Sequence, residues 1–94
     1  MEEKIITLIA RVLGVPKSEI ELDTEIGELP EWDSLRNVEV IAQLEQEFNV
    51  KITSDMIMDL EDVSDIVDLI ESLIDWYDSE RRAKHLALGF IAAR

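Results

Sequence analysis

One hydroxyl group in this sequence stands where a covalent modification could be held. Ser34 follows Asp33 at the predicted start of a helix, directly after a long connection. A hydroxyl in that place lies beside unpaired backbone N–H groups and the positive end of the helix dipole, which together stabilise a phosphate ester. Spacing alone favours a simpler role, in which Asp33 or Ser34 only caps the helix.

The other reactive side chains lack the partners that catalysis requires. The sequence has no cysteine and one histidine, His85 near the carboxyl terminus, so a Ser–His–carboxylate arrangement is not expected. The three glycines are too far apart to form a phosphate-binding loop. Acidic residues are so frequent that no single pair indicates a glycosidase-like site. We therefore predict no catalytic residue and no enzymatic activity.

A calcium site is the alternative that so many carboxylates suggest. The best EF-hand register begins at Asp23 and Glu25. It places Glu28 where the loop needs its glycine, and it ends on Ser34 where a bidentate glutamate belongs. The motif fails, and no metal site is predicted.

Ser34 is expected to lie at the start of the second of several helices. Apolar residues at intervals of three and four predict helices over residues 2–13, 33–48, 53–60 and from about 64 onward, the last capped by Ser64 or Asp65. Gly14 and Asn49 are the expected ends of the first two, and the segment 50–53 is expected to be extended loop. The prediction is an all-α bundle of three main helices and one short helix, with a long loop between helices 1 and 2.

The packing of this bundle can also be predicted. Aromatic residues make up 5% of the chain, so the core is expected to be aliphatic. Only four residues of the connection between the first two helices are expected to reach the core, namely Ile20, Leu22, Ile26 and Leu29. The expected apolar face of the second helix comprises Leu35, Val38, Ile41, Ala42, Leu44 and Phe48.

Charge is distributed very unevenly along the chain. All 22 acidic residues and five of the nine basic ones lie in residues 1–80, which carry −17, whereas residues 81–94 carry +4. Such a body would be repelled by nucleic acid and by anionic membranes, and it should attract proteins with basic surfaces.

The expected setting is the cytoplasm, and the expected state is a monomer. The amino terminus lacks the basic and apolar regions of a signal peptide, and no apolar run is long enough to span a membrane.

The segment 31–35, with sequence EWDSL, resembles the acyl carrier protein family. The family's Asp-Ser-Leu motif opens its second helix, and an acidic run ending in Phe leads to an Ile before the third; residues 44–52 repeat that pattern. The resemblance covers about residues 3–77 and is strongest at 29–52.

The resemblance implies a function. Ser34 would be the attachment point of 4′-phosphopantetheine, transferred from coenzyme A by a phosphopantetheinyl transferase. The protein would carry an acyl or aminoacyl group as a thioester for fatty-acid, polyketide or other pathways. Asp33 would cap and orient, and Leu35 would pack beside the arm. Arg36, Glu39 and Ala42 would face partner enzymes: a ligase, synthase or acyltransferase with a basic docking surface.

Three features depart from the family pattern. Arg36 occupies a position that is often acidic in fatty-acid carriers. Glu31 and Trp32 stand where small residues are usual, which is more similar to free-standing carriers of specialised pathways. Residues 79–94 extend past the usual end of the family, so we expect a carrier domain over 1–78 and a basic extension over 79–94, either helical or loosely ordered.

Two alternatives to the carrier hypothesis follow from the same residues. The chain could be an unmodified acidic helical module that binds proteins through its second helix, in which case Ser34 would be replaceable. It could also be an acidic calcium-binding domain, which would show a metal-dependent change in thermal stability.

Overall fold

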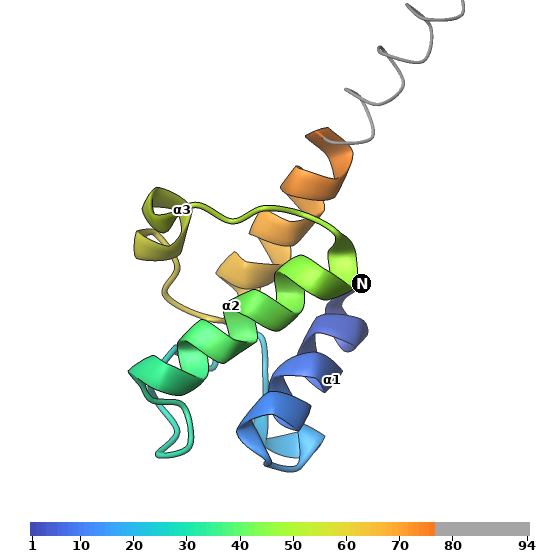
Figure 1. Ribbon diagram of the computed structural model, residues 1–94. Coiled ribbons are helices and arrows are strands. Elements are labelled where there is room, and N and C mark those ends of the chain that lie inside the picture. The colour runs from blue at the N-terminus through green and yellow to red at the C-terminus, as the bar shows by residue number, and fades with distance from the viewer. Residues whose placement is uncertain (77–94) are drawn as a thin grey trace, which may run out of the picture.

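The computed structural model describes residues 1–76 of the chain. Within that range the helices are α1 (Glu2–Leu13), a short 3-10 turn (Lys17–Glu19), α2 (Ser34–Phe48), α3 (Ser54–Met58) and a last helix that is described over 63–76 (Figure 1). Extended backbone pairs within the described range only at one isolated bridge, Glu25 with Asp62. The predicted all-α fold with three main helices, one short helix and a long first loop is confirmed.

Glycine and asparagine end the first two helices as expected. Gly14 has a φ of 71°, and its N–H donates to the carbonyl of Ala10 at 2.9 Å. Asn49 has a φ of 53°, and its N–H donates to the carbonyl of Glu45. Both residue types tolerate the left-handed conformation that closes a helix, so these two ends are fixed locally by sequence.

Helices α1 and α2 run in opposite directions and touch near both ends. At one end, Arg36 Nη1 donates to the carbonyl oxygen of Val12, the second-last residue of α1, at 3.1 Å. At the other end, Lys4 Nζ lies 5.9 Å from the centre of the Phe48 ring. The start of α2, where Ser34 lies, is therefore beside the end of α1 (Figure 1).

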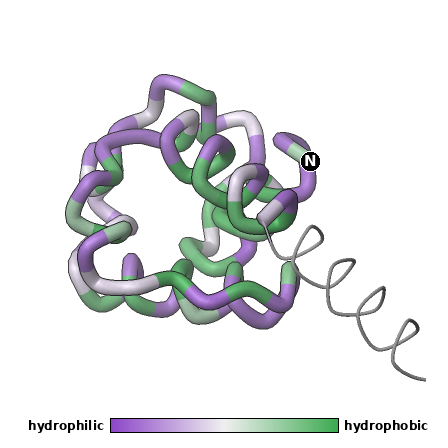
Figure 2. Tube along the Cα trace, turned by 90° about the horizontal axis from the view of Figure 1, so that it is seen from above, coloured by the Kyte–Doolittle hydropathy of each residue, from purple (hydrophilic) through white to green (hydrophobic). Residues whose placement is uncertain are grey.

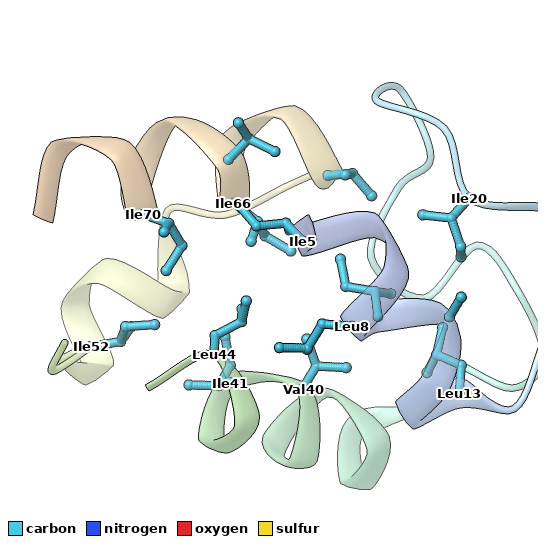
Figure 3. Close-up of a cluster of buried hydrophobic side chains, with 14 of the residues drawn as sticks. Ile5, Leu8, Leu13, Ile20, Val40, Ile41, Leu44, Ile52, Ile66 and Ile70 are labelled. Carbon is cyan, nitrogen blue, oxygen red and sulfur yellow. The ribbon is translucent and has the colours of Figure 1, made fainter. Parts of the chain in front are cut away.

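The core is formed where these two helices and the last helix meet. Figure 3 shows aliphatic side chains of the three helices pointing toward one another. Along the tube in Figure 2, hydrophobic and hydrophilic residues alternate, as expected of helices that bury one face. The fully buried aliphatic side chains are Ile5, Ile9, Val40, Leu44, Val63, Ile66 and Ile70.

The prediction of a purely aliphatic core is wrong in one place. Trp32, in the connection, is 1% exposed and is the largest fully buried side chain of the described residues. Within that connection, Ile20 is buried as expected, whereas Leu22 is 40% exposed. Thr24 is buried instead, and its hydroxyl accepts a hydrogen bond from the N–H of Glu21 at 2.9 Å.

The predicted apolar face of α2 is wrong at Leu35 and Val38, near its amino-terminal end, and also at Ala42, which is exposed. Leu35 and Val38 are 68% and 65% exposed, whereas Val40, Ile41 and Leu44 are buried. Leu35 precedes Leu44 by nine residues, which is about two and a half helical turns, and so it points to the opposite side. Counting intervals of three from Leu35 produced the error, because the true face starts later in the helix.

The last two helices differ in small ways from the prediction. Helix α3 ends at Met58, two residues before Leu60, and Thr53 is its cap. The last helix is capped neither by Ser64 nor by Asp65. The Asp62 carboxylate accepts from the N–H of Asp65 at 2.9 Å, which makes Asp62 the capping residue.

Two further observations bear on the sequence predictions. No helix among residues 1–76 is long and apolar enough to cross a membrane. The predicted extension over 79–94 lies outside the described residues.

Candidate functional site

Asp33 and Ser34 form the first turn of α2. Asp33 is the capping residue: its backbone is extended, and its Oδ1 accepts from the N–H of Arg36 at 2.8 Å. Ser34 is the first helical residue and is exposed. The cap therefore belongs to Asp33, which leaves the Ser34 side chain without that task. An exposed hydroxyl at this end of a 15-residue helix lies beside backbone N–H groups that the helix itself does not pair.

Trp32 fixes the backbone directly before this turn. Its indole Nε1 donates to Asn37 Oδ1 at 3.1 Å, and its N–H donates to the carbonyl of Leu29 at 2.9 Å. The buried ring therefore lies under the first turn of α2, with its polar atom paired. In the sequence, Trp32 was identified only as a departure from the family pattern. Its position as a single large aromatic residue beside the Asp-Ser-Leu motif was the signal that could have indicated this role.

Arg36 joins the start of α2 to α1. Its Nη1 donates to the Val12 carbonyl at 3.1 Å and lies 3.4 Å from Glu39 Oε2. The Val12 carbonyl belongs to the last turn of α1, where carbonyl groups lack partners within the helix, so the guanidinium stabilises that end. Arg36 was predicted to face partners. Its side chain is half-exposed, so part of the guanidinium is accessible to a partner while the contact to Val12 is kept.

One exposed face of α2 extends from Ser34. Leu35 and Val38 present apolar side chains to solvent, and Glu39 and Ala42 are exposed with them. On a helical wheel, these four residues lie opposite the buried Val40 and Leu44. The structure thus brings the predicted docking residues Glu39 and Ala42 together with Leu35 on the surface that adjoins Ser34.

The long connection before Ser34 is held by backbone hydrogen bonds to the start of the last helix. The N–H of Val63 donates to the carbonyl of Thr24 at 3.0 Å, and the N–H of Ser64 donates to the carbonyl of Leu22 at 2.9 Å. In the opposite sense, the N–H of Ile26 donates to the carbonyl of Glu61 at 2.9 Å. These bonds fix the loop that leads to the serine.

The carboxylates of the described chain do not gather into a metal site. Within residues 1–76, no group of three or more acidic or histidine side chains is arranged to hold an ion. The segment around Asp23 that was compared with an EF-hand loop contains a turn. In this turn the N–H of Glu25 donates to Glu28 Oε1 at 3.1 Å.

Comparison with known proteins gives a consistent result. The family model described as "Phosphopantetheine attachment site" matches residues 3–70. An acyl carrier protein of Azobacteroides pseudotrichonymphae is 38% identical over 73 residues, covering 77% of this chain and 86% of that protein. One from Porphyromonas gingivalis is 34% identical over 71 residues, covering 76% and 91%.

A solved structure is similar in fold. The solution structure of a holo acyl carrier protein from Geobacter metallireducens superimposes with a TM-score of 0.73, covering 89% of this chain and 91% of that one. The identity is 20%, so this likeness concerns the arrangement of the helices.

Proposed function

The chain belongs to the acyl carrier protein family, and from that premise we propose that Ser34 bears its 4′-phosphopantetheine group. The single observation that carries the assignment is the placement of Ser34 as the first, exposed residue of α2, after the Asp33 cap. The matched range 3–70 contains this residue. When bound, the group supplies a thiol on a flexible arm, which holds an acyl group as a thioester.

The residues around Ser34 fit such a group. A phosphodiester at Ser34 Oγ would lie at the positive end of a 15-residue helix, beside unpaired N–H groups. Asp33 would hold that turn in place through its bond to the Arg36 N–H, and the exposed Leu35 would lie beside the arm. The chain has no cysteine, so the thiol would come from the attached group.

The protein acts as a carrier in this proposal and has no turnover of its own. It would present a tethered substrate to successive enzymes at a high effective concentration. The carrier domain would comprise residues 1–78, as a monomer. Its partners would be a phosphopantetheinyl transferase and an acyl-activating ligase, synthase or acyltransferase.

Intact mass tests the attachment. The protein is incubated with coenzyme A and a broad-specificity phosphopantetheinyl transferase, and we expect a mass increase of one phosphopantetheine. Ser34→Ala should show no increase. Ser54→Ala is the matched control, since Ser54 is also the first residue of a helix, α3, and follows the cap Thr53. An unmodified wild-type protein would instead favour the unmodified interaction module.

The exposed face of α2 is the proposed docking surface. Glu39 supplies charge there, Leu35 and Val38 supply apolar area, and Ala42 leaves room for close approach. A basic partner would be steered by the acidic charge of the body and then held by the apolar side chains. Arg36 would fix the orientation of Glu39, from which it lies 3.4 Å away.

The rate of modification at low protein concentration tests this surface, with the transferase as partner. Glu39→Gln should lower that rate about two- to tenfold at low salt, and the difference should shrink at high salt because exposed charges are screened. The control is Asp68→Asn, the same loss of charge on the exposed side of the last helix. Equal losses in both variants would refute a specific docking role for Glu39.

A further inference from the structure

The interior of the bundle beside Ser34 is closed by Trp32. The ring is 1% exposed, and its Nε1 is bonded to Asn37, which lies one turn into α2. The backbone on either side is fixed as well, by the Trp32 N–H to the Leu29 carbonyl and by the Asp33 cap. Trp32, two residues before the attachment serine, is therefore held in place as part of the core.

The ring belongs to a core cluster of buried side chains. Val40, Leu44, Val63 and Ile66 are fully buried. No buried side-chain nitrogen or oxygen among the described residues lacks a partner, so no polar group marks a solvated interior. Inserting methylene groups into an interior packed to this degree forces strained rotamers and backbone shifts.

Three surface hollows formed by described residues have neither Trp32 nor Ser34 in their lining. One lies along α1, from Met1 to Arg11, together with Glu47 near the end of α2. A second, mainly apolar, is lined by Met56, Leu73 and Trp76 among others. A third lies between Met1 and the later half of the last helix.

We propose that Trp32 closes the core to the group carried on Ser34, so that this group stays in solvent. This inference rests on the proposed function. A long alkyl chain gains free energy for each methylene it buries, and a chain that enters the core at Trp32 would have to displace a hydrogen-bonded indole. The carrier is therefore suited to acyl groups that lose little free energy when exposed to solvent. These are short or polar groups, such as aminoacyl or hydroxyacyl groups. Trp32 is the residue that determines this specificity.

The wild-type protein gives the first test, which needs no variant. It is loaded with acetyl or octanoyl groups from the corresponding coenzyme A esters, and loading is verified by mass. The methyl resonances of Val40, Leu44 and Ile66 should be the same in both forms. The thioesters should be cleaved by hydroxylamine at rates within about twofold of each other. Shifted core methyl groups, or cleavage slowed several-fold in the octanoyl form, would overturn the proposal.

Replacing the ring gives the second test. Trp32→Ala should slow hydroxylamine cleavage of the octanoyl form at least threefold relative to the acetyl form, because the chain can enter the space that the ring leaves. Trp76→Ala, at the other end of the bundle, is the matched control and should behave like the wild type. A folded Trp32→Ala protein with no dependence on chain length would refute the role of Trp32. If that variant does not fold, Trp32→Leu is used in the same measurement.

The attachment at Ser34 and the role of Trp32 can be contradicted separately. A protein that gains no mass with any coenzyme A ester contradicts the attachment at Ser34. A protein that loads normally but buries its octanoyl chain leaves the attachment intact and contradicts only the proposal for Trp32.

Discussion

Two regions of this small protein are built in different ways. The core between α1, α2 and the last helix consists mainly of Ile, Leu and Val side chains, most of them at helical intervals. The serine end, residues 32–36, is held by single hydrogen bonds: Trp32 to Asn37, Asp33 to the Arg36 N–H, and Arg36 to the Val12 carbonyl.

The core therefore mainly determines the stability of the bundle, and the serine end mainly determines how Ser34 is positioned. Burial of many apolar groups is non-directional, so it stabilises the bundle without fixing one atom accurately. Hydrogen bonds are directional and contribute less each, but three of them around one turn fix the backbone that carries Ser34. We expect changes in the core to act on unfolding and changes at the serine end to act mainly on modification.

The largest effect is expected from two leucines on the same helix. Leu44 is fully buried and Leu35 is 68% exposed. Leu44→Ala should lower the free energy of unfolding by about 2–5 kcal/mol through lost burial and a residual cavity. Leu35→Ala should change it by less than about 0.5 kcal/mol. Urea unfolding of both variants measures this contrast, and similar losses would show that the two regions are not distinct.

A smaller effect is expected from the cap at the serine end. Asp33→Ala removes the acceptor of the Arg36 N–H and should cost about 1 kcal/mol in the free energy of unfolding. Asp33→Asn keeps an oxygen at that position and should cost less. Urea unfolding again gives the comparison. If asparagine is as destabilising as alanine, the carboxylate acts through its charge and not as a cap.

The smallest effect is expected at a surface pair that belongs to neither region. Lys17 Nζ donates to Glu3 Oε1 at 2.6 Å, and this hydrogen bond, helped by the charge of the lysine, lowers the pKa of Glu3. Because the folded-state pKa is lowered, the contribution of the pair is present at neutral pH and is lost as pH falls through that pKa.

An NMR titration of the Glu3 side chain measures this shift. Lys17→Gln should return the pKa of Glu3 toward its ordinary value, and Arg11→Gln, which removes a nearby charge without touching this bond, should not. The pair is exposed, so the wild type and Lys17→Gln should unfold with nearly equal free energies. A Glu3 titration that is unchanged in Lys17→Gln would contradict the assignment.

The core was largely predictable from the sequence, and most of the serine end was not. Periodicity correctly predicted a helix over 2–13, because many apolar residues recur at the same intervals. Ile5, Leu8 and Ile9 of that helix are buried. It misassigned Leu35, Val38 and Ala42, since the buried residues of α2 are Val40, Ile41 and Leu44.

The remaining features of the serine end depend on tertiary structure. The bond from Arg36 to Val12 spans 24 residues, and nothing in the local sequence indicates it. The burial of Trp32 depends on where the connection crosses the bundle, so a lone aromatic residue in a loop gave no periodic signal. Ser34 itself was singled out by the helix-start pattern and by resemblance to the family, and spacing alone favoured a simple cap.

The most direct test of the account locates the attached group on the protein as purified from its own cells. The protein is digested, and tandem mass spectrometry identifies which peptide and which residue carry phosphopantetheine. The account predicts the group on Ser34, within the peptide that contains Trp32 and Asp33, together with any acyl group that the arm holds. Phosphopantetheine on Ser54, Ser64 or Ser72, or its absence from every serine, would contradict the account.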